Sequence, residues 1–95
     1  MALGRGKPLG YDVGRMLFRF TMFDADREIA CSISSTALDD LAGKRGTQPS
    51  ERENQFIQHR EEIERAAAQV FDTNRNGKNR VLIVRLYAKH FKKLE

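Results

Sequence analysis

Two runs of alternating apolar and polar residues, separated by a short polar break, constrain the fold of this chain more than any other feature. In MLFRFTMF, residues 16–23, Phe18, Phe20 and Met22 fall on one side and Arg19 and Thr21 fall on the other. EIACSIS, residues 28–34, alternates in the same way. Successive side chains of a β-strand point to opposite faces, so each run predicts a half-buried strand. The intervening DADR, residues 24–27, predicts a turn that joins the two strands into an antiparallel hairpin.

Two helices and a third strand are predicted after the hairpin. STALDDLA, residues 35–42, follows a serine that can cap a helix and precedes a glycine that can end one. Ser50 and Glu53 have the spacing of a capping box, which predicts a long helix over residues 51–71. The β-branched run RVLIVRLY, residues 80–87, predicts a third strand that is covered on much of its surface.

These elements predict an α+β fold: a small antiparallel sheet of three to four strands with two helices packed on one face. The first fourteen residues contain four glycines and one proline and show no periodicity. They predict a flexible N-terminal arm, residues 1–14, ahead of a single α+β domain, residues 15–93. The predicted core comprises Phe18, Phe20, Met22, Ile29, Cys31, Ile33, Leu38, Leu41, Phe56, Ile63, Ala67, Val70, Leu82 and Val84.

The charge of the chain is unevenly distributed. The formal net charge of +4 divides into +3 over residues 1–20, −5 over residues 21–72 and +6 over residues 73–95. Basic ends can attract phosphates, although loose basic termini are also common in small soluble proteins. The sequence therefore favours scattered basic termini over a dedicated nucleic-acid surface.

The sequence also indicates a compartment. No apolar run is long enough to span a membrane, and no apolar segment follows the basic N-terminal residues as it would in a secretory signal. Cys31 is the single cysteine and cannot form an internal disulfide. We therefore expect a cytoplasmic protein that does not associate with membranes.

The stretch FDTNRNGKN, residues 71–79, resembles the first half of a calcium-binding loop. Asp72, Asn74, Asn76 and Gly77 occupy four of the required positions, but the position of the bidentate glutamate falls on Ile83, and Arg80 occupies another ligand position. The surrounding cations would repel a divalent ion. A helix end followed by a turn explains these residues better, and we expect neither a metal nor a cofactor.

Candidate catalytic residues are few. Cys31 and His59 could be imagined as a nucleophile and its base. However, Cys31 belongs to the inward face of a predicted strand, where cysteine is usually inert packing, and His59 lies off the apolar stripe of the long helix. The sequence predicts that the protein is not an enzyme.

Arg60 lies within the apolar stripe, four residues after Phe56 and three before Ile63. A guanidinium in that position either extends along the stripe to water or pairs with a carboxylate such as Asp39 or Asp40. A ligand contact is the third alternative, because a bidentate fork at a groove can bind an acidic group.

A dispersed pattern extends along most of the chain. YD at residues 11–12, LFRFTMFD, EIACSIS followed by STAL, and FIQHREEIERAA at residues 56–67 precede a glycine turn, a strand and a closing HF. Over roughly residues 11–91 the chain resembles a small bacterial family known as domain of unknown function 1488. This resemblance implies a bacterial, cytoplasmic, single-domain α+β protein with no established activity and no catalytic residues to transfer.

We therefore expect a non-catalytic binding or interaction module with an unknown protein partner, existing as a monomer or weak dimer. The alternative is a nucleic-acid-binding accessory protein that uses basic residues of the sheet and termini, with weak non-specific binding. An outward cluster of Arg19, Arg80 and Arg85 on one sheet face, with an aromatic residue among them, would favour that alternative. Together with Arg60, these arginines are the candidate contact residues.

Overall fold

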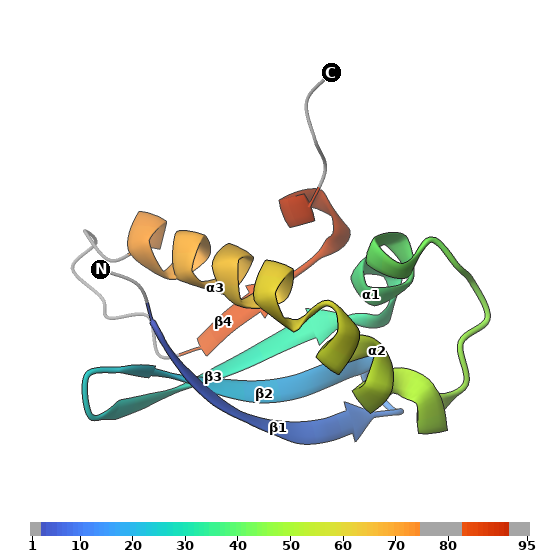
Figure 1. Cartoon of the computed structure of the whole chain (residues 1–95), viewed down its shortest axis with the longest axis horizontal. Helices are drawn as coiled ribbons and strands as arrows, with labels where there is room; N and C mark the ends of the chain where they lie inside the picture. The colour runs from blue at the N-terminus through green and yellow to red at the C-terminus, as the bar shows by residue number, and fades with distance from the viewer. Residues whose placement is uncertain (1–2, 75–82, 92–95) are drawn as a thin grey trace.

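One four-stranded sheet carries all the helical segments on one of its faces (Figure 1). The computed structural model describes residues 3–74 and 83–91. The strands, in spatial order, are β1 (Gly4–Asp12), β2 (Leu17–Asp24), β3 (Arg27–Ser34) and β4 (Ile83–Leu86). The helical segments are α1 (Ser35–Ala42), η1 (Pro49–Glu51), α2 (Arg52–Gln58), α3 (Arg60–Asn74) and η2 (Ala88–Phe91). The predicted α+β class is confirmed, with a mixed, mostly antiparallel sheet.

The predicted hairpin is present in β2 and β3. The two strands pair without a register shift from Leu17 opposite Ser34 to Asp24 opposite Arg27. The alternation has the predicted sense, because the apolar residues of both strands are buried toward the helices. Arg19 and Ser32 therefore point to the opposite, outer face of the sheet.

Residues 4–12 form β1 and pair with β2, so the prediction of a flexible arm is wrong for this segment. The register between β1 and β2 shifts between Arg5 and Pro8 and again between Pro8 and Gly10. Each shift places an extra residue in β1, as in a β-bulge. Glycine and proline are common at bulges and edge strands, so the residues that suggested flexibility mark an irregular edge strand instead. The bulges also hide the period of two that identifies a strand in sequence.

The strand predicted over residues 80–87 contributes β4 within the described residues. It pairs parallel to β3, with Ser32 opposite Arg85 and Ile33 opposite Leu86. Parallel neighbours need a long crossover connection, and the segment containing α1, α2 and α3 provides it. The expected antiparallel sheet is thus refined to one with a single parallel pair among the described strands.

Helix α1 has the predicted limits. The hydroxyl of Ser34 accepts a hydrogen bond from the amide of Ala37, which caps the first turn. Gly43 ends the helix in the left-handed conformation, with φ 66°. Short capping signals at both ends therefore located this helix correctly.

The long helix predicted over residues 51–71 is divided into two. His59 has φ −114° and ψ 20°, which interrupts the helical backbone between α2 and α3. The expected capping box is absent, since α2 has no side-chain hydrogen bond at its N-cap, which is Glu51. The short η1 turn precedes α2 in its place. Both halves keep their apolar residues on the sheet, so the periodic stripe alone did not reveal the interruption.

The core lies between the helices and the inner sheet face. The ring of Phe56 is 4.8 Å from that of Phe18 and 4.9 Å from that of Phe20, measured between centroids. Most of the predicted core is confirmed as buried. Leu41 and Val70 are only partly buried, and Leu82 lies outside the described residues. The buried apolar residues outside the predicted core are Leu3, Ala37, Ala66, Phe71 and Leu86.

Candidate functional site

Two of the predicted contact arginines lie in one line on the outer face of the sheet. Arg19 of β2 is opposite Ser32 of β3, and Ser32 is opposite Arg85 of β4. We call these three residues the arginine row. The antiparallel pairing of β2 with β3 and the parallel pairing of β3 with β4 bring them together from positions 66 residues apart in the chain. All three side chains point away from the helices.

The arginine row borders a hollow of about 450 Å³ on this outer face. Small residues form its centre, because Ala30 and Ser32 of β3 lie between the longer side chains of the neighbouring strands. The lining residues are Asp12, Arg15, Leu17, Arg19, Ala30, Cys31, Ser32 and Arg85. Three guanidinium groups thus surround a shallow floor that can approach a partner closely.

The positive charge of this hollow is only partly neutralised. Asp12 lies 3.9 Å from the exposed guanidinium of Arg15 and accepts a hydrogen bond from its amide. Arg19 and Arg85 are exposed, and no carboxylate among the described residues pairs with either of them. An arginine fork that lacks an internal partner can bind a carboxylate or phosphate in bidentate fashion.

Arg60 has a structural partner, but not one of the predicted pair. Its Nε donates to Glu64 at 2.9 Å and one of its terminal nitrogens donates to the carbonyl of Gly6 at 2.9 Å. Arg5 of β1 also donates three hydrogen bonds of 2.9–3.1 Å to Glu64. These contacts connect α3 to β1. Of the alternatives that the sequence left open, Arg60 pairs with a carboxylate, but this carboxylate is Glu64 and not Asp39 or Asp40.

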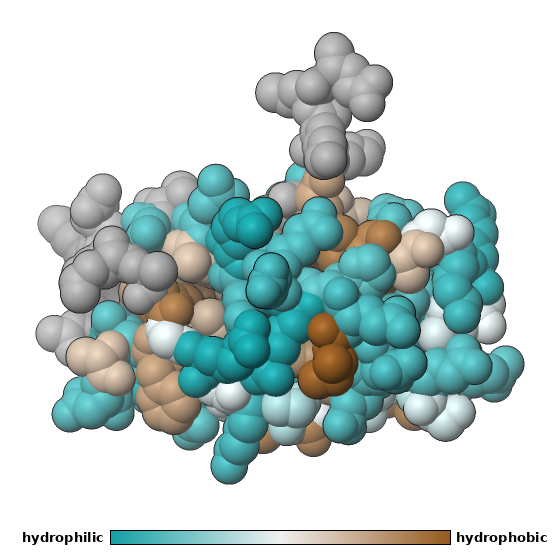
Figure 2. All heavy atoms as spheres, in the orientation of Figure 1, coloured by the Kyte–Doolittle hydropathy of each residue, from teal (hydrophilic) through white to brown (hydrophobic). Residues whose placement is uncertain are grey.

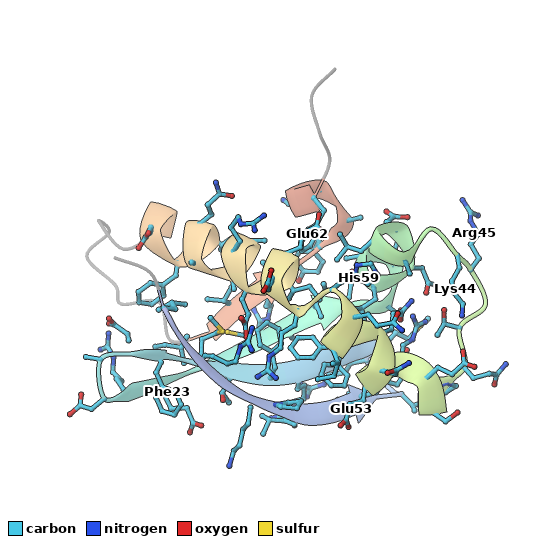
Figure 3. All side chains as sticks on the ribbon, in the orientation of Figure 1. Phe23, Lys44, Arg45, Glu53, His59 and Glu62 are labelled. Carbon is cyan, nitrogen blue, oxygen red and sulfur yellow. The ribbon has the colours of Figure 1, made fainter. Side chains whose placement is uncertain are left out.

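Arg60 also lines a second hollow, of about 540 Å³, at the junction of α2 and α3. Its charges are mixed, since Glu61 and Glu62 lie among Arg5, Arg60 and Arg65. Figure 3 labels His59 and Glu62 at this junction, and Figure 2 shows a mostly hydrophilic surface interrupted by separate hydrophobic areas. Carboxylates among the arginines make this hollow a weaker anion site than the one beside the arginine row.

Arg52 makes the contact with Asp39 that was one of the alternatives for Arg60. Its guanidinium donates to Asp39 at 2.7 Å and to Gln55 at 2.8 Å, and it lies over the ring of Tyr11 at 5.3 Å. Thr47 also donates to Asp39, at 2.8 Å. The signal for Arg52 was its place four residues before Phe56, which extends the apolar stripe by one turn.

The carboxylate of Asp39 has a shifted pKa. Burial acts to raise it, but hydrogen bonds from Arg52, Thr47 and Gln55, together with the charge of Arg52, outweigh burial and lower the pKa below its ordinary value. This network holds the loop between α1 and η1 against α2, so its role is structural.

Cys31 and His59 are not joined by a hydrogen bond. The thiol of Cys31 is buried and donates to the carbonyl of Ile29 at 3.7 Å, whereas His59 lies at the junction of α2 and α3. Burial raises the pKa of Cys31 to about 12, despite a backbone hydrogen bond from Met22 that acts to lower it. The group is therefore a neutral thiol at physiological pH.

Several expectations concern residues outside the described ranges. Arg80 lies there, as does most of the segment that resembles a calcium loop. Within residues 3–74 and 83–91, no group of three or more metal-ligating side chains occurs. In the same residues, no helix has the length and apolar character needed to cross a membrane.

The sequence matches the protein family described as "Protein of unknown function (DUF1488)" over residues 7–83. The chain belongs to the DUF1488 family. The resemblance drawn from the sequence is thus confirmed, although the match begins at residue 7, within β1. No curated protein matches the chain.

The fold is also similar to that of another DUF1488 protein. A crystal structure of a family member of unknown function from Shewanella loihica PV-4 superposes with a TM-score of 0.65. The two sequences are 22% identical, and the similarity covers 83% of this chain and 90% of that one. At this level of identity the likeness concerns the fold alone. Arg19 and Ser32 lie within the DUF1488 match, and Arg85 lies just beyond its end.

Proposed function

We propose that this DUF1488 protein is a non-catalytic binding module that captures an acidic segment of a protein partner on the outer face of its sheet. The single observation that carries this proposal is the arginine row, Arg19–Ser32–Arg85, on a sheet face that no described helix covers.

The spacing of the row suits carboxylates. Adjacent strands lie about 4.8 Å apart, so the Cα atoms of Arg19 and Arg85 are separated by about 10 Å. Two flexible guanidinium groups at that separation can converge on one carboxylate or hold two neighbouring ones, with the hydroxyl of Ser32 as a further donor between them.

Exposed apolar side chains lie beside the arginines. Leu9 is 47% exposed and Val13 is 64% exposed, and both line a smaller hollow that includes Arg19. Met16, in the turn between β1 and β2, is 60% exposed. Arginine and methionine are enriched in protein–protein interfaces. A partner segment that combines acidic and apolar residues would match this surface.

The outer face carries negative charge at its other end, which favours a protein partner over a nucleic acid. Asp26 and Glu28, at the hairpin end of β2 and β3, are exposed. Asp24 pairs with Arg27 at 2.9 Å and contributes no net charge. A long polyanion lying along the strands would meet repulsion at this end. A protein segment can instead present complementary charges of both signs.

The non-catalytic character and the compartment are part of the same proposal. The neutral thiol of Cys31 and the guanidinium groups of the row are poor nucleophiles and bases at physiological pH. A lone buried thiol fits the reducing cytoplasm.

Nucleic-acid binding is the second candidate, and one observation favours it. Tyr87 is 48% exposed and follows Arg85 by two residues, so an exposed aromatic ring and a guanidinium lie close together in the chain. Bases of single strands stack on such rings, whereas the phosphates pair with the arginines.

A fluorescence anisotropy titration tests both candidates. The probes are a labelled peptide of alternating glutamate and leucine, the same peptide with glutamine in place of glutamate, and a labelled single-stranded oligonucleotide of matched length. We expect binding of the acidic peptide at about 150 mM salt, where the screening length is about 8 Å. We expect the oligonucleotide to dissociate at that salt concentration.

The matched variants have the same net charge. Arg19→Gln with Arg85→Gln removes the row, and Arg45→Gln with Arg65→Gln removes two exposed arginines elsewhere, in the α1–η1 loop and on α3. The first pair should weaken peptide binding at least about tenfold and the second should not. Equal effects of the two pairs would overturn the proposal. Oligonucleotide binding that survives this salt and needs the row would favour the second candidate.

A further inference from the structure

We infer that the partner of the outer sheet face is a second copy of this chain, packed face to face so that Glu28 of each copy lies between Arg19 and Arg85 of the other. The inference rests on the proposed function in using the same surface, and it names the partner. It follows from the charge pattern of that face, which is basic at one end of the strands and acidic at the other.

A two-fold axis between the two sheets accounts for the match. Thr21 of β2 and Ala30 of β3 form a cross-strand pair midway between the basic and acidic ends. Suppose that the axis lies between the two sheets, above this pair and perpendicular to the strands. Each strand of one copy then lies over the same strand of the other copy and runs in the opposite direction. Ser32 of one copy, two residues beyond Ala30, then lies over Glu28 of the other copy, which is two residues before Ala30. An interface of this kind is isologous, with the same contacts made twice.

The arginine row forms the receptor in this arrangement. Arg19 and Arg85 flank Ser32 on the two neighbouring strands, so a carboxylate above Ser32 has a guanidinium on either side. Glu28 is exposed, and no cation among the described residues pairs with it. Packed sheets lie about 10 Å apart, a gap that an arginine and a glutamate side chain can bridge together.

The neighbouring contacts agree with the same axis. Phe23 is the cross-strand partner of Glu28, and Figure 3 shows it projecting from the sheet on the side away from the helices. The axis places Phe23 over Arg19 of the other copy, a pairing that a cation–π contact stabilises. It also places the β1–β2 turn, with Arg15, over the β2–β3 turn, with Asp26. Ala30 at the centre allows close approach.

The size of the face indicates a weak dimer. The strands lie about 4.8 Å apart, and their nine, eight, eight and four described residues, at about 3.4 Å each, give a face of roughly 500 Å². A standard interface buries about 800 Å² on each partner. Association should therefore appear at tens to hundreds of micromolar protein, and it should weaken as salt screens the charges.

Sedimentation velocity of the full chain, from about 5 µM to about 500 µM, tests the association by its concentration dependence. We expect a monomer at the low end and a reversible dimer at the high end. A monomer at every concentration would overturn the inference.

A charge exchange tests the arrangement. In Glu28→Arg, the new arginine repels the arginine row of the other copy. In Arg19→Glu with Arg85→Glu, the acidic row repels Glu28 of the other copy. Each variant alone should remain monomeric. Their equimolar mixture should form a heterodimer, because both contacts are then attractive. Failure of the mixture to associate, when the wild type does, would refute the proposed orientation.

Two controls separate this inference from the proposed function. Arg65→Glu, on α3, should leave self-association unchanged. Glu28→Arg keeps the arginine row and should still bind the acidic peptide. If the wild type is monomeric and Glu28→Arg binds the peptide, the inference falls and the proposed function stands. If neither association nor peptide binding occurs, both fall.

Discussion

The guanidinium of Arg52 lies 2.7 Å from the carboxylate of Asp39 and over the ring of Tyr11, so one side chain of α2 contacts both α1 and β1. Only 6% of the Arg52 side chain is exposed, compared with 18% of the Asp39 side chain. The pair connects α1 to α2, and Thr47 of the loop that follows α1 donates to the same carboxylate. Its integrity therefore affects the stability of the fold and leaves the outer sheet face unaltered.

Replacing Arg52 should destabilise the protein. Arg52→Ala leaves Asp39 without its charged partner and removes the contact with Tyr11. Breaking a buried ion pair costs about 3–5 kcal/mol, and the partial exposure of Asp39 lowers the expected loss to about 2–3 kcal/mol. Urea unfolding measures this loss in the free energy of unfolding. Arg45→Ala, at an exposed position, should change the free energy of unfolding by less than about 0.5 kcal/mol. Equal losses in the two variants would contradict the structural role of Arg52.

The same network should make stability depend on pH in the acid range. The pKa of Asp39 is lowered in the folded state, so its contribution is present above the unfolded value of about 3.9. It is lost as the pH falls through the lower, folded pKa. The difference in unfolding free energy between wild type and Asp39→Asn should therefore be largest near neutral pH and shrink below about pH 4. A difference that grows on acidification would contradict the direction of the shift.

Cys31 should react slowly with a thiol reagent in the native protein. Its pKa of about 12, against an ordinary value of 9.0, reduces the thiolate fraction about 1000-fold, and burial restricts access further. Labelling with a chromogenic disulfide at pH 8 should be slow, and it should become fast in denaturing urea. Rapid labelling of the folded protein would reopen a nucleophilic role for this residue.

The glycines of β1 give a test of the strand itself. A Cβ atom on Gly6 would overlap the carbonyl oxygen and Oγ1 of Thr21, whereas a Cβ on Gly4 would have its nearest neighbours at 3.7 Å. Gly6→Ala should therefore cost about 1–3 kcal/mol, as overpacking does, and Gly4→Ala should cost much less. Thermal unfolding of the two variants compares them directly. If residues 4–12 were a flexible arm, neither change would affect stability.

The outcome for β1 shows where sequence patterns lose information. The β2–β3 hairpin keeps its register throughout, so the period of two survived in the sequence and both strands were predicted. In β1, two bulges break that period, and Gly6 is present because Thr21 lies against it. That reason depends on a neighbour fifteen residues away, which local sequence reasoning does not include.

The candidate site was predictable in part for a related reason. Alternation placed Arg19 on the outer face, and Arg85 was among the candidate contact residues. Their alignment through Ser32 depends on the parallel pairing of β4 with β3, which the crossover of the helices produces. That Arg52 and not Arg60 contacts Asp39 has a similar origin. Both lie on the apolar stripe, and the packing of α2 against α1 places Arg52 beside Asp39.

The central claim is that the arginine row on the outer sheet face binds an acidic partner, and amide chemical shifts test it most directly. The measurement is a titration of the 15N-labelled protein with the alternating glutamate–leucine peptide, at a protein concentration below that of self-association. We predict saturable shifts at Arg19, Ser32 and Arg85, with unchanged amides at Arg65 on α3. Shifts confined to the α2–α3 junction, or no saturable shift at all, would contradict the account.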